Sequence, residues 1–404
     1  MTGSVDVEFL IVGGGMTGDA AVRGIRSIRP DGGICLISDE PHPPYDRPPL
    51  SKGLWSGDEE ERIWRDTASL DAEIRAGVRI VRLDPRAREL EDSEGRRYRY
   101  GSLLLATGSR PRTLAGPGPG VVYFRTLEDF RTLRERVASG GAVGIVGGGF
   151  IGCELAASMA GQGLEMDQFF PESQPLEQVL APPFSELLAR KLEALGVQLH
   201  PGKGIGSATR TPEGLHLLDE AGERSGPFAA LAAGLGVDPR DELASRAGLD
   251  TRDGILVDRS LRTSDPHIWA AGDVARFPLG LADAPQVVAH EEHANESGML
   301  AGRAMAGEEV EYDPLPYVYA GIGSVNIELL GLPAPSDRWE VRPPDDPEGR
   351  GVARALRGPH VTGVLIWNRP GRAHLVRRRF PRPGDAQAEP GDLSLDVLAE
   401  LVLE

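Results

Sequence analysis

Residues 9–18 read FLIVGGGMTG, and residues 142–152 read AVGIVGGGFIG. Each stretch places an apolar run before glycines spaced as G-x-G-x-x-G, namely Gly13, Gly15 and Gly18, and again Gly147, Gly149 and Gly152. This pattern predicts a strand, a tight turn and a helix: the first glycine permits the turn, the second lets a pyrophosphate approach the backbone, and the third lets the helix pack on the strand. Single copies are weak signals in a chain with 52 glycines. Two copies predict two bound dinucleotides, and therefore hydride transfer between them.

The composition is that of an ordinary globular protein. Of the 404 residues, 40% are hydrophobic and 26% are charged. No apolar stretch approaches the roughly 20 residues of a membrane span, and no targeting segment precedes the first strand, so we expect a cytoplasmic protein. The two cysteines, Cys35 and Cys153, form no C-x-x-C motif. The sequence therefore predicts neither a redox dithiol nor a metal site, and we interpret Cys153 as a packing residue.

The formal net charge is −17. A strongly acidic chain is a poor partner for nucleic acid, which binds to basic surfaces, so we expect no nucleic-acid partner. The most conspicuous basic run is Arg377, Arg378 and Arg379. We interpret it as the solvated end of a strand.

The order of apolar runs and glycine turns predicts an α/β fold with two Rossmann-like nucleotide-binding domains and a small α+β domain at the C-terminus. The first domain is expected to be discontinuous, from residues 1–115 and 246–312. The second is expected over 116–245 and the third over 313–404. In the last domain we predict strands at 361–367 and 373–380 and a closing helix at 395–403.

Several further motifs follow in order: YDRPPLSK at 45–52, ATG at 106–108, GGGFIGCE at 147–154, FFPE at 169–172, Gly272-Asp273, the segment 290–294, and GVLIWN at 363–368. As an ordered set they resemble the FAD- and NADH-dependent, ferredoxin reductase-like oxidoreductases of the pyridine nucleotide-disulfide class, with a glutathione reductase-like plan. Phe-Pro-Glu and Val-Leu-x-Trp-Asn favour the apoptosis-inducing factor family within that class.

The resemblance implies an FAD site in the first domain. Asp39 or Glu40 ends the second strand where a carboxylate would bind the adenosine ribose, and the family pattern favours Asp39. The resemblance implies that Ile80 offers a backbone contact to FAD, that Arg47 contacts the pyrophosphate and that Arg112 contacts the flavin. It also implies that Asp273 holds the ribityl chain and that the helix that begins near His290 faces the pyrimidine edge of the flavin. The alternative interpretation, a solvated surface arginine, fits Arg112 better than Arg47.

An NADH site is expected in the second domain. Glu172 lies 20 residues after Gly152, the spacing of a carboxylate that binds both ribose hydroxyls and repels a 2′-phosphate, so NADH is favoured over NADPH. The resemblance places Gly236 at the nicotinamide ribose and Phe150 at its ring, although Phe150 also fits a core position. Tyr319 stands where the family usually has Trp-Ser-Asp, and we expect it to stack near the cofactors.

The resemblance implies that Lys52 and Glu154 form an ion pair beside the flavin N5 and position the nicotinamide. Hydride transfer needs orientation rather than a base, so these two residues are our catalytic candidates, with His290 tuning the flavin at the same edge. A structural salt bridge is the alternative for the pair, and a packing residue is the alternative for His290.

The predicted function is FAD-dependent NADH oxidation with an unidentified acceptor, either a small molecule or an iron–sulfur protein. One alternative is a ferredoxin or rubredoxin reductase with a dedicated partner, which the charge of −17 disfavours because acidic partners need a basic docking face. The other is a redox-sensing protein whose homodimer forms in response to NADH.

Overall fold

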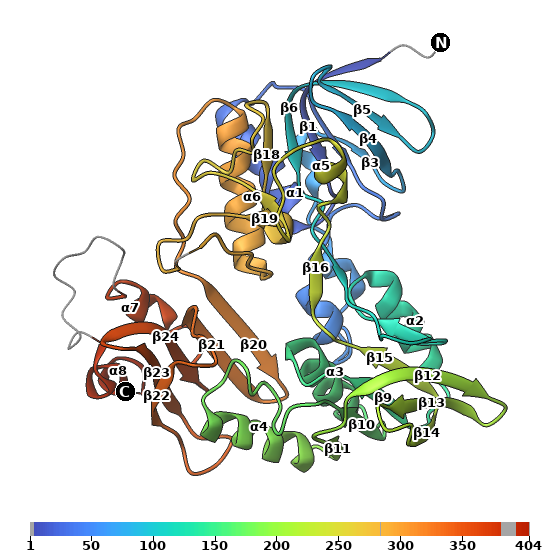
Figure 1. Cartoon of the computed structure of the whole chain (residues 1–404), viewed down its shortest axis with the longest axis vertical. Coiled ribbons are helices and arrows are strands. Elements are labelled where there is room, and N and C mark those ends of the chain that lie inside the picture. The colour runs from blue at the N-terminus through green and yellow to red at the C-terminus, as the bar shows by residue number, and fades with distance from the viewer. Residues whose placement is uncertain (1–3, 283, 381–392, 404) are drawn as a thin grey trace. The chain divides into compact units, whose positions relative to one another are not determined.

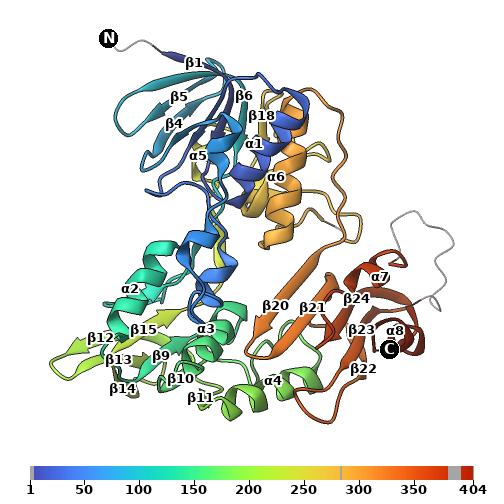
Figure 2. The same ribbon diagram turned by 180° about the vertical axis from the view of Figure 1, so that it is seen from behind.

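The computed structural model describes residues 4–282, 284–380 and 393–403. The chain forms two compact units (Figures 1 and 2). The first contains residues 1–46, 60–110 and 238–316, and the second contains residues 47–59, 111–237 and 317–404. The three-domain division expected from the sequence stays a prediction. Among the described residues, no helix has the length and apolarity needed to cross a membrane.

The first unit is built on a seven-stranded sheet of order β3-β2-β1-β6-β5-β4, with β18 beside β6. The strands β3, β2, β1, β6 and β18 run parallel, whereas β5 and β4 form an antiparallel extension. Strand β6 pairs through its first residues with β5 and through its last residues with β18. The strands are β1 (Val5–Val12), β2 (Ile34–Ile37), β3 (Glu73–Arg75), β4 (Ile80–Asp84), β5 (Glu89–Asp92), β6 (Arg97–Leu105) and β18 (Ile268–Ala270).

Two long helices of this unit, α1 (Met16–Ile28) and α6 (Glu291–Met305), pack directly against each other. Glycines make the close approach possible: a Cβ on Gly24 would lie 2.2 Å from the Met299 carbonyl oxygen, and one on Gly302 would lie 2.2 Å from that of Ala21. The remaining elements are η2 (Glu60–Ile63), η3 (Thr67–Leu70), α5 (Glu242–Arg246), β17 (Ile255–Leu256), η4 (Gly272–Val274) and β19 (Ala275–Arg276). The strands β7 (Ser109–Pro111) and β16 (Val237–Pro239) carry the chain between the units.

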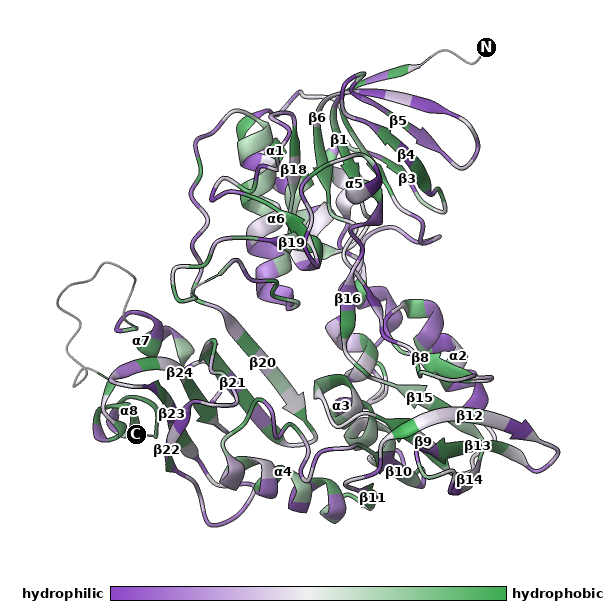
Figure 3. Cartoon of the chain, viewed as in Figure 1, coloured by the Kyte–Doolittle hydropathy of each residue, from purple (hydrophilic) through white to green (hydrophobic). Residues whose placement is uncertain are grey.

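The second unit contains a parallel sheet of order β11-β10-β9-β15-β8. Strands β9 and β15 are wholly apolar and buried, which is typical of a parallel sheet covered by helices. Figure 3 shows hydrophobic colours on β9 and β15, and largely hydrophilic colours on α2. The elements are β8 (Val121–Tyr123), α2 (Leu127–Val137), β9 (Val143–Val146), α3 (Phe150–Ala160), β10 (Met166–Phe169), α4 (Pro182–Ala194), β11 (Val197–His200) and β15 (Ala230–Ala233), with an antiparallel side sheet of β12 (Ile205–Thr211), β13 (Gly214–Asp219) and β14 (Arg224–Phe228).

The same unit carries an antiparallel sheet of order β20-β21-β24-β23-β22. It packs on the helices of the parallel sheet: the rings of Phe184 in α4 and Trp367 in β24 lie 5.4 Å apart, and the turn at Gly323 lies against Ala157 of α3. The elements are η1 (Pro48–Ser51), β20 (Tyr317–Ile322), β21 (Val325–Gly331), β22 (Arg338–Arg342), β23 (Gly351–Arg357), β24 (His360–Trp367), α7 (Ala373–Arg377) and α8 (Leu395–Leu403).

The strand predicted at 373–380 is wrong, because this segment begins with the helix α7. The cause is a distant carboxylate. Glu328 in β21 is buried, and its two oxygens accept hydrogen bonds from the backbone N–H groups of Gly371 and Ala373. These bonds stabilise a turn and a helix start where the local sequence favoured a strand. Arg377 consequently ends a helix, not a strand. The closing helix predicted at 395–403 is confirmed.

Candidate functional site

The first glycine motif joins β1 to α1 through a turn that the protein's own packing requires. Gly13 has φ +128°, and a Cβ there would lie 2.0 Å from the carbonyl oxygen of Ala106. A Cβ on Gly18 would lie 2.1 Å from the carbonyl oxygen of Gly13. Gly15 is the N-cap of α1, and no side chain caps this helix. The first N–H groups of α1 are therefore available to an anion such as a pyrophosphate.

The second motif repeats this geometry between β9 and α3. A Cβ on Gly147 would lie 2.3 Å from the Gly234 carbonyl oxygen, and one on Gly152 would lie 2.1 Å from the Gly147 carbonyl oxygen. A Cβ on Gly149, by contrast, meets its nearest atom, the Gly234 oxygen, only at 4.0 Å. The protein itself does not need glycine at this middle position. Open space beside another helix without a side-chain cap fits a ligand that approaches the backbone closely.

Asp39 lies just after β2, at the edge where the first helix begins. The guanidinium of Arg240 donates to its carboxylate at 2.7 Å, and Arg79 lies 3.8 Å away. Burial raises the pKa of Asp39, but the hydrogen bond and charge of Arg240 outweigh burial and hold the pKa below its usual value. The Ala-Thr-Gly motif positions that arginine, because Thr107 donates to the Arg240 carbonyl and the Gly108 carbonyl accepts the Arg240 N–H.

Two other residues predicted to lie near the adenosine of FAD, Glu40 and Ile80, have well-defined contacts within the protein. The carboxylate of Glu40 accepts a hydrogen bond from the hydroxyl of Tyr45 at 2.6 Å. Ile80 begins β4, is buried, and pairs with Asp92 of β5. Asp39, with its negative charge secured by arginine, remains the better candidate for the ribose.

Glu172 lies just beyond β10, the position in the second sheet that corresponds to Asp39 in the first. It is half-buried, and Gln178 donates to its carboxylate at 3.0 Å. A carboxylate at this sheet edge is suited to accept hydrogen bonds from two ribose hydroxyls and would repel a third phosphate.

The structure brings Arg112 and Gly236 together. The Arg112 N–H donates to the Gly236 carbonyl at 3.0 Å, and Gly236 has φ +84°. A Cβ on Gly236 would lie 3.6 Å from the Arg112 guanidinium. Arg47, which the resemblance assigned to the pyrophosphate, donates to the carbonyl oxygen of Arg125 at 3.0 Å.

Asp273 and His290 lie at the carboxyl end of β18 and at the start of α6. Asp273 belongs to the short helix η4, and Ser109 donates to its carboxylate at 2.7 Å. His290 is the N-cap of α6, and its Nδ1 accepts the N–H of Glu292 at 3.4 Å. Both positions agree with the predicted helix near residue 290 and leave the roles of Asp273 and His290 as predictions.

Sequence analysis missed His293, one turn into α6. Its ring is buried, with Tyr312 donating to Nδ1 at 2.6 Å and Nε2 donating to the Gly272 carbonyl at 3.2 Å. Burial lowers the pKa of His293 to about 4, against the opposing charge of Asp273. The imidazole is therefore neutral and fixes the backbone beside Asp273. The feature of the sequence that could have identified His293 is its spacing, three residues after His290.

Lys52 and Glu154 form the predicted ion pair, with Nζ and Oε1 2.8 Å apart. Lys52 comes from the loop after η1, and Glu154 from the first turns of α3. Glu154 is 3% exposed and also accepts the hydroxyl of Ser51 at 2.6 Å. Burial raises the pKa of Glu154, while the charge of Lys52 and the two hydrogen bonds oppose this rise. Both partners belong to the second unit, and their role beside a flavin stays a prediction.

The two predicted aromatic contacts are not core residues. Phe150, the first residue of α3, is half-buried, so the core interpretation does not fit it. Tyr319 on β20 is 38% exposed, and its ring lies 6.0 Å from that of Tyr317. Cys153, by contrast, is fully buried, and burial raises the pKa of its thiol to about 12, which confirms a packing role.

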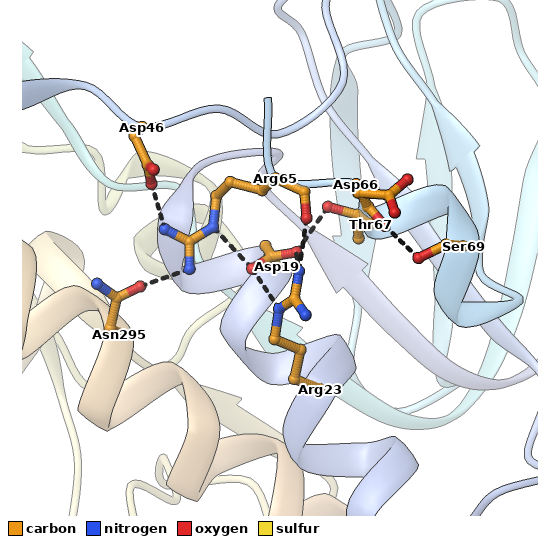
Figure 4. A network of polar contacts seen from close by, with 8 residues as sticks. All are labelled: Asp19, Arg23, Asp46, Arg65, Asp66, Thr67, Ser69 and Asn295. Carbon is orange, nitrogen blue, oxygen red and sulfur yellow. Dashed lines mark hydrogen bonds and ion pairs between the residues drawn. The ribbon is translucent and has the colours of Figure 1, made fainter. Parts of the chain in front are cut away.

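A buried carboxylate in α1, Asp19, organises the first unit (Figure 4). Asp19 accepts hydrogen bonds from Arg23, from Arg65 at 2.7 Å and from Thr67 at 2.7 Å. Arg65 also donates to Asp46, the residue before Arg47, and to Asn295 of α6 at 2.8 Å. One guanidinium thus ties the predicted FAD-binding loop to both helices that begin at the sheet edge.

The two glycine motifs, each followed by a carboxylate at the next strand end, define an oxidoreductase that binds two dinucleotides. The family model for pyridine nucleotide-disulphide oxidoreductases matches residues 7–303. The chain belongs to this family. It is an FAD-dependent oxidoreductase that uses NADH.

Within this family, the chain is similar to several ferredoxin reductases. The chain is 33% identical over 346 residues to a probable ferredoxin reductase of Castellaniella defragrans, which covers 82% of this chain and 84% of that protein. It resembles the crystal structure of a ferredoxin reductase from Rhodopseudomonas palustris with a TM-score of 0.87 and 30% identity, covering 98% and 100% of the two chains. It also resembles putidaredoxin reductase in its covalent complex with putidaredoxin, with a TM-score of 0.87, 27% identity, and coverage of 98% and 99%.

Proposed function

We propose that the chain is the NADH-dependent reductase of a ferredoxin-type iron–sulfur protein in the cytoplasm. One NADH would be oxidised to NAD⁺ with release of a proton, and its two electrons would reduce two one-electron iron–sulfur acceptors. The names of the relatives that cover about four fifths of the chain support this acceptor. The sequence alone predicted an unidentified acceptor, with a ferredoxin or rubredoxin reductase as the first alternative. We now prefer that alternative.

The state of the cysteines is the structural observation that excludes electron transfer through a dithiol, and the relatives support an iron–sulfur protein as the acceptor. Members of a disulphide oxidoreductase family that reduce disulphides need a reactive pair of thiols. Cys35 and Cys153 are both free and buried, and burial raises the pKa of each to about 12. The chain has no other cysteine. Its electrons must therefore leave to an external acceptor rather than through a dithiol.

The chain's own residues would bind and orient the reactants. Bound FAD would accept a hydride from NADH and release electrons singly. The N-termini of α1 and α3 would hold the two pyrophosphates, and Asp39 and Glu172 the adenosine riboses. Lys52 and Glu154, fixed by each other and by Ser51, would hold the nicotinamide in a reactive orientation.

Steady-state kinetics test the proposal directly. With NADH and a purified [2Fe–2S] ferredoxin, reduction of cytochrome c should depend on ferredoxin and saturate with it. Ferricyanide, a small acceptor, serves as the control that hydride transfer works. Rapid ferricyanide reduction without any ferredoxin-dependent turnover across several acidic ferredoxins would contradict the proposed acceptor.

The apoptosis-inducing factor branch, with an NADH-dependent homodimer, is the second candidate. Its support is the Phe-Pro-Glu and Val-Leu-x-Trp-Asn motifs. Trp367 and Asn368, however, have a packing function: Trp367 is buried, and both side chains donate to the Pro347 carbonyl. Sedimentation of the oxidised protein and of the same sample under anaerobic NADH tests this candidate. An increase in sedimentation coefficient on reduction would favour it over the reductase.

A further inference from the structure

Positive charge is concentrated in one short part of the chain. Residues 349–380 contain eight arginines and no aspartate or glutamate, in a protein whose net charge is −17. Arg354 and Arg357 form ion pairs with Glu340 and Asp337. The other six form what we call the arginine surface: Arg350, Arg369, Arg372, Arg377, Arg378 and Arg379.

The arginine surface is formed around α7 and the turn before it. Gly351 of β23 pairs with Trp367 of β24, so Arg350 and Arg369 lie just beyond the same end of these two strands. Burial, together with the positive charges of Arg350 and Arg372, lowers the pKa of Arg369. The guanidinium of Arg377 lies over the ring of Tyr317, 5.5 Å from its centroid. Arg378 is exposed and follows α7 directly.

Glu328 fixes this surface to the sheet. Its buried carboxylate accepts the Gly371 and Ala373 N–H groups at 3.0 and 3.2 Å, and the Tyr317 hydroxyl at 2.6 Å. One carboxylate therefore orients both the segment that carries the arginines and the first residue of β20. Strand β20 in turn packs alongside α3, the helix of Glu154, within the same unit.

We infer that the arginine surface is the docking site for an acidic iron–sulfur protein; this inference rests on the proposed function. The net charge of −17 disfavours an acidic partner only at long range, because exposed charges are screened over about 8 Å at physiological ionic strength. Within that distance a partner senses the charges of the surface that it contacts, and residues 349–380 carry eight arginines and no aspartate or glutamate. Tyr319, exposed beside Tyr317, adds an aromatic contact to the arginine rim, a composition typical of interface hot spots.

Charge reversal tests the inference. The triple variant Arg372→Glu, Arg378→Glu, Arg379→Glu should raise the KM for a purified acidic [2Fe–2S] ferredoxin by at least about tenfold and weaken the dependence of KM on salt. Its FAD content and its rate with ferricyanide should stay unchanged. The control is Arg82→Glu, Arg97→Glu, two exposed side chains in β4 and β6 of the other unit, which should leave the KM for ferredoxin and the rate with ferricyanide unchanged. If the triple variant loses FAD, the exposed pair Arg378→Glu, Arg379→Glu alone is used.

The outcomes separate the inference from the function. An unchanged KM in the variant overturns the docking site and leaves the reductase intact. If wild-type protein reduces ferricyanide and no ferredoxin, the proposed function fails, and interferometric binding of the same ferredoxin decides the docking site: salt-sensitive binding lost in the variant supports it, and absent binding overturns it. Binding of a DNA duplex that is lost in the variant, without ferredoxin binding, would assign the surface to another class of partner.

Discussion

The two copies of the glycine motif share a backbone geometry and differ in what surrounds it. Around the first copy, α1 is packed against α6 and carries the fully buried Asp19, which accepts hydrogen bonds from three side chains. Asp39, the predicted ribose carboxylate, is paired with Arg240. Around the second copy, Glu172 is half-buried and is contacted by Gln178.

This difference matches the two roles of the cofactors. A prosthetic group is retained when its binding loops are fixed in place before binding, since little ordering then opposes binding. We therefore propose that the first motif, whose loop and two helices are held together by Arg65, binds FAD, and that the second binds NADH.

The largest expected effect comes from the buried network of the first motif. Asp19→Asn removes the buried one of the two carboxylate partners of Arg65, so unfolding of the FAD-bound protein should become easier by about 3 kcal/mol, the cost typical of breaking a buried ion pair. Urea unfolding followed by flavin fluorescence measures this. The control is Glu8→Gln, which removes the exposed pair with Arg29 and should cost less than about 1 kcal/mol. Equal effects of the two changes would show that Asp19 does not hold a buried network together.

His293 should make the first unit sensitive to acid. Its pKa is lowered from 6.5 in an unperturbed histidine to about 4, so the unfolded chain binds the proton first as the pH falls. The stability is present above pH 6.5 and is lost toward pH 4, by about 3 kcal/mol for a shift of this size. The loss should be smaller in His293→Gln and unchanged in His374→Gln, an exposed histidine. Parallel pH profiles for all three proteins would contradict a neutral buried His293.

The ion pair at the second motif should control the rate of flavin reduction. Lys52→Met or Glu154→Gln should each slow flavin reduction by NADH by about 100-fold, because small misplacements of a reactant cost that much. The double variant should cost less than the product of the two, since each single change leaves a lone partner. Anaerobic stopped-flow absorbance measures the rates. Lys203→Met, at a more exposed lysine, is the control.

The smallest effect concerns coenzyme choice. Reduction should be faster with NADH than with NADPH by at least about tenfold, or 1.4 kcal/mol. Glu172→Gln should narrow that ratio, whereas Glu177→Gln, five residues further along and bonded to Ser173, should not. A wild-type ratio near one would show that Glu172 does not contact the ribose.

The features that depend only on residues close together in the chain were predictable from the sequence. The glycine motifs were predictable because a left-handed φ at Gly13 and Gly147, and close helix–strand contact at Gly18 and Gly152, exclude a side chain in any setting. The resemblance supplied the Lys52–Glu154 pair, which no spacing alone would have joined across 102 residues.

Contacts between distant segments decided the rest. The segment 373–380 reads as a strand until Glu328, 45 residues away, accepts the backbone N–H of Ala373. His290 and His293 are equivalent in the sequence, and only burial under Tyr312 made the second neutral and structural. Asp19 became a hub only when Arg65 and Thr67 reached it. The sequence by itself determined the two nucleotide-binding folds, because these depend on steric limits within a few residues. The tertiary structure decided the charge and the partners of the polar side chains, because these depend on which groups share a desolvated environment.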